Sequence, residues 1–283
     1  MAETRASVAH FADAPVEQWA KRNLLQGMAF TLDPTTGQEY VFIAQAQSGG
    51  PGDIEDSLYH RHLLVGGKLQ YLDTMTVRKL GHPQNFHVRV SVRGNPWVWG
   101  TATRYLAGRR IGTKVARFPY QAGTVTIGAA GFTYIEGLKG NSLSPIASPY
   151  TEGRGRITIR RARALSETYT EYRETDLLNG KPKALRSFTR SKGPGVYQSS
   201  AASADEVAVI KGATEEKHRL YRYSWDGQLL GDPFDVTGVR APTGPNTSSE
   251  AESVAYWGGS LFIAKRYNST ARRIFAIFSV ENA

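Results

Sequence analysis

The feature that most constrains the fold of this chain is a short motif that occurs five times at similar spacing. In each copy, one polar residue opens a run that favours β structure. The five polar residues are Gln26, His87, Glu152, Gln198 and Glu252. Neighbouring copies lie between 46 residues (152 to 198) and 65 residues (87 to 152) apart. Repeats of about 40–50 residues are typical of propeller blades, which are four-stranded sheets placed around a central channel. The motif therefore predicts an all-β fold, a five-bladed β-propeller.

Glycine-containing pairs between the β-prone segments support this prediction. Such pairs supply the positive φ angles that tight hairpins need. They are Gly66-Gly67, Gly94-Asn95, Asn179-Gly180, Asp226-Gly227 and Gly258-Gly259. Helical periodicity is nearly absent, and residues 16–25 form the one segment for which we expect a helix. The hairpin pattern thus favours sheets along the rest of the chain.

The strands expected in each blade follow from the alternation of apolar and polar residues. Blade one runs from residue 24 through residues 39–45 to residues 62–79, and blade two comprises residues 86–92, 96–105 and 114–127. Blade three comprises residues 150–159, 167–176 and 183–189, and blade four residues 196–202, 206–211, 219–225 and 228–236. Blade five starts at residue 249 and runs to the C-terminus. Residues 128–149 are rich in Gly, Ser and Pro, so we expect a long loop there.

We expect one propeller domain, residues 24–283, preceded by an N-terminal arm, residues 1–23. An open ring of blades would leave an unpaired edge strand, which promotes aggregation. A strand in the arm, near residues 7–12, is therefore expected to pair with the last blade, which contains residues 260–264 and 273–280. Pairing of the N- and C-terminal strands would close the propeller.

Composition excludes several classes of protein. The chain has no cysteine, which excludes disulfides, cysteine-based zinc sites and thiol nucleophiles. It has no apolar run of 18 residues, so we expect no membrane span. Residues 1–14 contain charged side chains and no apolar segment, so we expect synthesis in the cytoplasm without a secretory signal peptide.

One polar residue on the innermost strand of each blade would form a ring around the central channel. The predicted ring consists of Gln26, His87, Glu152, Gln198 and Glu252. Two interpretations are open: the ring holds an ion, a sugar hydroxyl or a phosphate, or its members bind each other, water and backbone groups, because buried polar groups need partners. Two carboxylates in the ring disfavour an anion in the channel unless His87 or Arg154 offsets their charge.

The net charge points to a polyanionic partner. Lys and Arg number 35 against 25 Asp and Glu, which gives a net charge of +10, and such a field attracts polyanions. The densest basic run supplies the candidate anion-binding residues Arg154, Arg156, Arg160 and Arg161. A guanidinium group suits phosphate because it donates two parallel hydrogen bonds. Wall teichoic acid, a poly(polyol phosphate), fits this pattern. The alternative is that these arginines only keep the surface soluble.

Three tryptophans in blades two and four are candidates for stacking on sugars. They are Trp97, Trp99 and Trp225. Because side chains alternate along a strand, one face of each strand can belong to the core and the other to a ligand surface. The alternative is that all three rings pack in the core.

Metal binding and catalysis are only weakly indicated. His60 and His62 lie on one side of a strand, and residues 53–56 form an acidic segment, but neither has the ligand number or spacing of a known site. We expect no cofactor, with a structural cation such as calcium as the exception. Hydrolase and nucleotide-binding motifs are absent. Glu152 and Glu252 are the candidate carboxylate pair of a glycosidase, although we expect a binding protein and not an enzyme.

Several segments resemble one known family. They are Leu25-Gln26-Gly27-Met28-Ala29-Phe30, Leu80-Gly81-His82-Pro83-Gln84-Asn85-Phe86-His87-Val88, Trp97-Val98-Trp99 and Glu250-Ala251-Glu252-Ser253-Val254-Ala255. The family is the five-bladed propeller shared by receptor-binding proteins of Gram-positive phages, teichoic acid biosynthesis protein C and helveticin-type bacteriocins. The resemblance covers residues 24–280 and implies binding to a cell-wall glycopolymer.

The resemblance and the positive charge together predict a receptor-binding protein of a phage tail, or of a tail-like particle, that recognises an anionic cell-wall glycopolymer. A helveticin-like bacteriocin and an enzyme that processes teichoic acid or wall glycan are the alternatives. By analogy with tail proteins, we expect a homo-oligomer, a trimer, located in the virion tail with other tail proteins. Nucleic acid is not expected as a partner.

Overall fold

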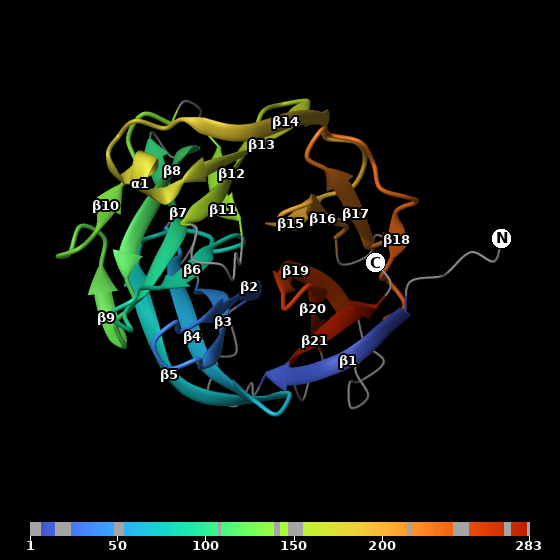
Figure 1. Cartoon of the computed structure of the whole chain (residues 1–283), viewed down its shortest axis with the longest axis horizontal. Helices are drawn as coiled ribbons and strands as arrows, with labels where there is room; N and C mark the ends of the chain where they lie inside the picture. Colours follow the sequence, from blue (N-terminus) through green and yellow to red (C-terminus); the bar gives the residue numbers. More distant parts are fainter. Residues whose placement is uncertain are drawn as a thin grey trace.

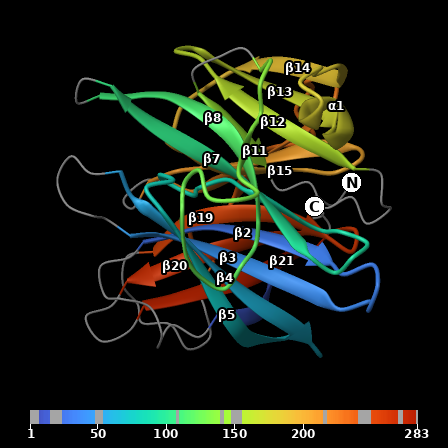
Figure 2. The ribbon, with the colours of Figure 1, turned by 90° about the vertical axis from the view of Figure 1, so that its left-hand side faces the viewer.

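The computed structural model of the chain describes residues 7–14, 24–47, 54–106, 109–138, 142–146, 155–213, 217–239, 249–268 and 273–281. These residues form five sheets arranged around one axis, which confirms the predicted five-bladed β-propeller (Figure 1). In the side view, the sheets of neighbouring blades are inclined to one another (Figure 2). No helix of the described residues has the length and apolar character that a membrane span requires.

Blades one and two are linked by one strand that leaves blade two and pairs with blade one. From the axis outward, blade one consists of β2 (Leu24–Leu32), β3 (Glu39–Gln47), β4 (Asp56–Val65) and β5 (Lys68–Arg78), and blade two of β6 (His87–Val90), β7 (Pro96–Leu106), β8 (Arg109–Pro119) and β10 (Thr133–Tyr134). Between β8 and β10 the chain forms β9 (Gly123–Thr126), which pairs in parallel with β5 of blade one. The prediction of a single blade-two strand over residues 114–127 is therefore wrong, because this segment is divided between β8 and β9. Alternation of side chains predicts a strand but not its partner.

Blade three differs most from the prediction. It consists of β11 (Leu143–Ile146), β12 (Arg156–Ala162), β13 (Ser166–Arg173) and β14 (Ala184–Ser191). The innermost strand is β11, in a segment predicted as loop, and the strand predicted over residues 150–159 corresponds to the second strand, β12. Pro145 in β11 reads as a strand breaker, but an innermost strand is a sheet edge, where a residue without an N–H group is tolerated.

One short helix, α1 (Glu174–Leu178), connects β13 to β14 and was not predicted. The helix expected over residues 16–25 is wrong where it can be compared, because Leu24 and Leu25 belong to β2. The remainder of that segment, residues 16–23, lies outside the described residues.

Blades four and five follow the predicted order. Blade four consists of β15 (Tyr197–Ala202), β16 (Glu206–Lys211), β17 (Arg219–Ser224) and β18 (Phe234–Asp235), and blade five of β19 (Ser249–Trp257), β20 (Ser260–Asn268), β21 (Arg273–Glu281) and β1 (Ser7–Ala14). β1 pairs antiparallel with β21 along its length, from Ser7 opposite Glu281 to Ala14 opposite Phe275. The predicted closure of the ring by the two terminal strands is thus confirmed.

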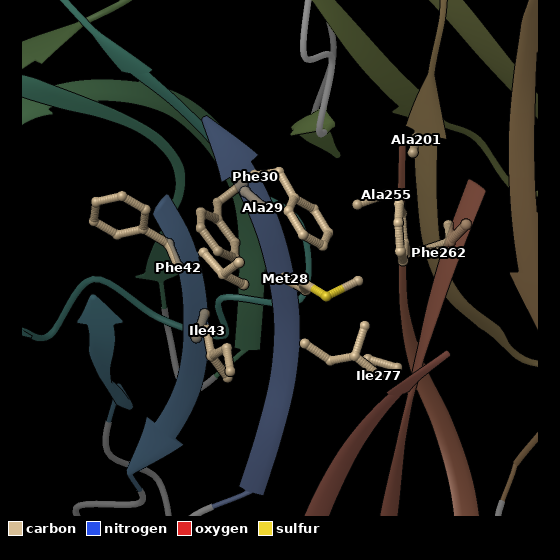
Figure 3. Close-up of a cluster of buried hydrophobic side chains, with 14 of the residues drawn as sticks. Met28, Ala29, Phe30, Phe42, Ile43, Ala201, Ala255, Phe262 and Ile277 are labelled. Carbon is tan, nitrogen blue, oxygen red and sulfur yellow. The ribbon is translucent and has the colours of Figure 1, made fainter. Parts of the chain in front are cut away.

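The largest hydrophobic core lies between the blades around the closure. Figure 3 shows Met28 and Phe30 of β2 facing residues of blade five. The centroid of the Phe30 ring lies 4.9 Å from that of Phe262, and the ring centroid of Phe11, in the closing strand, lies 5.0 Å from that of Phe262. Aromatic pairs at such distances stabilise a core beyond the area that they bury. Packing therefore joins the first blade, the last blade and the N-terminal strand.

Candidate functional site

The recurrent polar residue marks a β-bulge on the innermost strand in three of the five blades. The bulge residues are Gln26 in β2, Gln198 in β15 and Glu252 in β19. In each case the residues on either side pair with consecutive residues of the second strand, so the polar residue is left unpaired. A bulge of this kind redirects a side chain and increases the local twist. The sequence repeat is therefore a repeat of backbone geometry, and it places these three side chains alike.

The other two members of the predicted ring differ. His87 opens β6 opposite Trp99, without a bulge, and it is 4% exposed. Burial, and to a smaller extent the nearby charge of Arg89, lowers the pKa of His87 to about 3. Glu152 lies outside the described residues, and the innermost strand of its blade is β11, so the ring position predicted for blade three does not fall on β11.

The segment that precedes β6 lies against the bulge residues of other blades. His82 bridges two side chains of blade one: its Nε2 is 2.6 Å from Oε1 of Gln26, and its Nδ1 is 3.0 Å from Oε2 of Glu55. Gln84 donates through Nε2 to Oε1 of Gln198 at 3.0 Å. The segment thus contacts the polar residues of blades one and four, which are not neighbours in the ring (Figure 1).

The polar network continues from blade four to blade five. Gln198 donates through Nε2 to Oε1 of Glu250 at 2.6 Å, and Oε2 of Glu250 accepts from Nη2 of Arg266 at 2.6 Å. Nη1 of Arg266 is also 3.1 Å from Oε1 of Glu252. Burial raises the pKa of Glu252 to about 8, opposed by Arg266 and reinforced by Glu250. Gln26 and Gln198 are therefore hydrogen-bonded within the protein, and Glu252 lies beside Arg266.

Two of the four predicted anion-binding arginines are engaged with carboxylates of the neighbouring strand. Nη1 of Arg156 lies 3.1 Å from Oε2 of Glu171, and Nη2 of Arg160 lies 2.5 Å from Oε1 of Glu167. Arg160 is buried and Arg161 partly buried, whereas Arg154 lies outside the described residues. The arginine run thus contributes to a network of ion pairs within blade three.

The three candidate tryptophans have different environments. Trp99 is fully buried in a cluster with apolar residues of blades two and three, so it offers no face to a sugar. The rings of Trp97 and Trp225 are partly buried, and each has a guanidinium group over it: Cζ of Arg117 lies 3.6 Å from the Trp97 ring, and Cζ of Arg186 lies 3.9 Å from the Trp225 ring. Arginine therefore already covers one face of both rings.

The candidate metal ligands do not assemble into a site. His60 Nδ1 lies 2.7 Å from Oγ1 of Thr74 and its Nε2 3.0 Å from Oε1 of Gln45, while burial lowers the pKa of His62 to about 4. In the acidic segment, Asp53 lies outside the described residues and Asp56 accepts a hydrogen bond from the backbone of Lys79. Among the described residues, no group of three or more His, Asp or Glu side chains is placed to hold a metal ion.

Sequence reasoning missed a second set of buried polar residues. They lie on the second strand of blades one, four and five, opposite the residue that precedes the bulge: Gln45, Lys211 and Lys265. All three are at most 3% exposed. A signal for two of them exists in the sequence, because Phe42-Ile43-Ala44-Gln45 and Phe262-Ile263-Ala264-Lys265 differ only in their last residue.

The fold has known counterparts, although sequence comparison finds no relative. No protein-family model matches the chain, and no curated protein matches it. The tail fibre of Staphylococcus aureus phage P68 is similar in structure, with a TM-score of 0.72 and 15% identity over 98% of this chain and 53% of the fibre chain. This chain thus spans about half of the fibre's length. A GH43_1 enzyme from Xanthomonas citri is more distant, with a TM-score of 0.50 and 11% identity over 96% of this chain and 91% of the enzyme. At these identities the comparisons show the propeller fold alone.

Proposed function

We propose that this protein is a receptor-binding component of a phage tail or tail-like particle, and that it binds an anionic cell-wall glycopolymer such as wall teichoic acid. The observation that carries the proposal is the similarity to a phage tail fibre, which extends over 98% of the chain. The segments that resemble receptor-binding propellers of Gram-positive phages support it. One of them, residues 80–88, contains the residues that join blade one to blade four.

The distribution of exposed charge favours a polyanionic ligand. Among the described residues, the exposed basic side chains are Lys68, Arg78, Lys79, Arg93, Lys114, Arg163, Arg173, Lys181, Lys183, Lys217 and Arg219. The exposed acidic side chains are fewer: Glu136, Asp205, Asp226, Asp232 and Asp235. Several other carboxylates are buried in ion pairs, such as Glu167 and Glu171. A surface with this excess attracts a phosphate polymer and accelerates its encounter with the protein.

The proposal includes the organisation of the chain in the particle. Residues 1–23 form an arm that contains the closing strand, and residues 24–283 form the propeller. Copies of the protein act together as a homo-oligomer, a trimer, in the tail of the virion beside other tail proteins. Several weak contacts to one polymer then combine by avidity, so no single site needs high affinity.

One observation favours an enzyme as a second candidate. Because the pKa of Glu252 is raised to about 8, this carboxyl group keeps its proton at neutral pH, as a general acid of a glycan-processing enzyme requires. Its exposure of 1% argues against that role, since a substrate has to reach the proton. A helveticin-like bacteriocin is the third reading of the same resemblance.

Exposure of Gram-positive cells to the purified full-length protein separates the three functions. An adhesin coats the cells and competes with phage infection without lowering viability. A bacteriocin kills susceptible cells. An enzyme releases phosphate, polyol or sugar from purified walls, and Glu252→Gln abolishes the release. We expect coating and competition; killing, or release that depends on Glu252, would overturn the adhesin assignment.

A further inference from the structure

Two buried lysines occupy equivalent positions in neighbouring blades. Lys211 of β16 lies opposite Tyr197, and Lys265 of β20 lies opposite Ala251. Both partners directly precede a bulge residue on the innermost strand. Lys211 is 3% exposed and Lys265 is fully buried. The two lysines thus occupy equivalent positions on the second strand of their blades, so the surroundings of their ammonium groups can be compared directly.

The two ammonium groups differ in how well they are satisfied. Nζ of Lys265 donates to the carbonyl oxygens of Val236, Thr237 and Val239 at distances of 2.8–3.0 Å. Nζ of Lys211 donates to the carbonyl oxygen of Pro194 at 3.4 Å, and this is its one hydrogen bond within the described part of the chain. An ammonium group has three donors. Lys211 therefore has unused hydrogen-bonding capacity at a buried position, where Lys265 has none to spare.

Positive charge surrounds Lys211. Burial lowers its pKa, and the charges of Arg190, Arg160 and Lys192 lower it further, whereas Glu167 raises it. The one carboxylate in this set is shared, since Oε1 of Glu167 is 2.5 Å from Nη2 of Arg160 and Oε2 is 2.6 Å from Nη2 of Arg190. Arg160, Arg190 and Lys211 therefore face a single carboxylate between blades three and four, and the charge of Lys192 acts on Lys211 as well.

The two arginines also keep unused donors. Both side chains are 9% exposed, and the Nε atom of each is buried without a hydrogen-bond partner among the described residues. Such atoms are uncommon in folded proteins, and a ligand or water usually accounts for them. The guanidinium of Arg160 is held by the Tyr197 ring, 3.5 Å from its Cζ, and that of Arg190 donates to the hydroxyl of Tyr223 at 3.0 Å. Both cations are thus fixed in position before any ligand arrives.

Lys211 of this cluster lies directly against an exposed loop. Residues 193–196 connect β14 to β15 and are exposed, and a Cβ atom built on Gly193 would be 3.9 Å from Nζ of Lys211. Gly193 and Gly195 both have positive φ, +58° and +86°, a conformation that favours glycine and that turns the loop over the lysine. The backbone of this loop thus lies against the Lys211 ammonium group, which donates to the carbonyl oxygen of Pro194.

We propose that Lys211, Arg160, Arg190 and Lys192 form a binding site for a phosphate-type oxyanion at the junction of blades three and four. A phosphate group offers several acceptor oxygens and a charge that compensates the excess of cations. The identity of the natural occupant rests on the proposed function: it is a phosphodiester of the wall polymer. Free inorganic phosphate has the same oxyanion chemistry. This site differs from the arginine run that the sequence suggested, because Lys211 and Arg190 come from other strands.

The test measures binding of inorganic phosphate to the full-length protein, by calorimetry and by the rise of the melting temperature over that in chloride at equal ionic strength. We expect Lys211→Gln to weaken phosphate binding about tenfold, the usual effect of losing a charge-assisted hydrogen bond. Lys192→Gln, at a partly exposed position, is the second variant in case the first fails to fold. Lys114→Gln is the control. It removes the same charge at another place, because Lys114 pairs with Glu136 at the surface.

Each outcome decides the proposal. Phosphate binding that is retained in Lys114→Gln and weakened in both site variants supports the site. Absence of phosphate binding in the parent protein, or equal binding in all variants, overturns it. Binding of glycerol phosphate oligomers identifies the occupant. If the protein binds these oligomers more tightly than inorganic phosphate, the wall polymer is supported as the occupant. If it binds them more weakly, the wall polymer is refuted and the free ion is the occupant. If the parent protein and Lys211→Gln bind walls equally, the wall polymer is refuted as the occupant of this site while the proposed function stands.

Discussion

The side chain of Asn85 is bound to the backbone of Ser200 across 115 positions of the sequence. Oδ1 of Asn85 accepts a hydrogen bond from the N–H group of Ser200 at 3.1 Å, and also from the hydroxyls of Tyr197 and Ser199. Asn85 precedes the first strand of blade two, and Ser200 lies on the innermost strand of blade four. Blade three lies between these blades in the ring, so this bond joins parts of the propeller that share no sheet.

Asn85→Ala is expected to lower the free energy of unfolding by about 1–3 kcal/mol. The substitution leaves the N–H group of Ser200 without its acceptor at a buried position, and such a group loses its hydration without compensation. Urea unfolding followed by fluorescence measures the change. Asn95→Ala, in an exposed turn, is the control and should stay within about 0.5 kcal/mol of the parent. Equal effects of the two substitutions would contradict a structural role for the crossing segment.

Stability should fall steeply as the pH drops below the ordinary histidine range. Burial lowers the pKa of His60 and His87 to about 3 and of His62 to about 4, from an ordinary value of 6.5. Between pH 6.5 and about 4 the unfolded chain takes up protons that the folded chain excludes, so each histidine lowers the free energy of unfolding by about 1.4 kcal/mol per pH unit. Urea midpoints at pH 7 and pH 5 measure the effect.

His87→Gln should remove one proton from this dependence, because glutamine does not titrate. A midpoint that does not move between pH 7 and pH 5 would show that the buried histidines are protonated in the folded protein.

Glu252→Gln should become more stabilising as the pH rises from about 4.5 to about 8. The folded protein holds the Glu252 proton with a raised pKa of about 8, chiefly because of burial, so in this range the parent binds a proton that its unfolded chain has released. The parent therefore loses stability with rising pH, and the glutamine variant, which does not titrate, avoids that loss. Melting temperatures of both proteins at pH 5 and pH 8 test this. A difference that is the same at both pH values would refute the raised pKa.

Removal of residues 1–14 should open the ring. Without β1, the strand β21 becomes an exposed edge next to a hydrophobic core, and such edges promote association between chains. We expect a lower melting temperature and concentration-dependent aggregation, measured by light scattering. Removal of residues 1–6, which precede the closing strand, is the control. A shortened protein that remains monomeric and equally stable would contradict closure by the terminal strands.

The sequence predicted the fold better than it predicted the surroundings of the polar residues. The bulge residues Gln26, Gln198 and Glu252 were found because similar backbone geometry selects similar residues at each copy. Blade three was misassigned because its innermost strand contains Pro145 and has no polar residue of this kind, so the motif was matched to Glu152. Local patterns carry information on strand type, and they carry little on which strands pair.

The partners of the arginines and tryptophans could not be predicted for the same reason. Whether Arg160 contacts Glu167 depends on the register of β12 against β13, which no local pattern specifies. Likewise, Trp99 and Trp97 are two residues apart on one strand and point to the same face. Trp99 is fully buried against apolar residues of blade three, whereas Trp97 is partly buried under Arg117. Of the buried polar residues opposite the bulges, Gln45 and Lys265 were detectable because each follows Phe-Ile-Ala, whereas Lys211 follows Ala-Val-Ile and has no such signal.

Co-sedimentation of the full-length protein with purified Gram-positive walls tests the central claim most directly. Walls that retain their teichoic acid are compared with walls from which it has been extracted, over a range of salt concentrations. We expect binding to the intact walls, a steady loss of that binding as salt screens the positive surface, and no retention on the extracted walls. Equal binding to intact and extracted walls would contradict recognition of an anionic wall polymer.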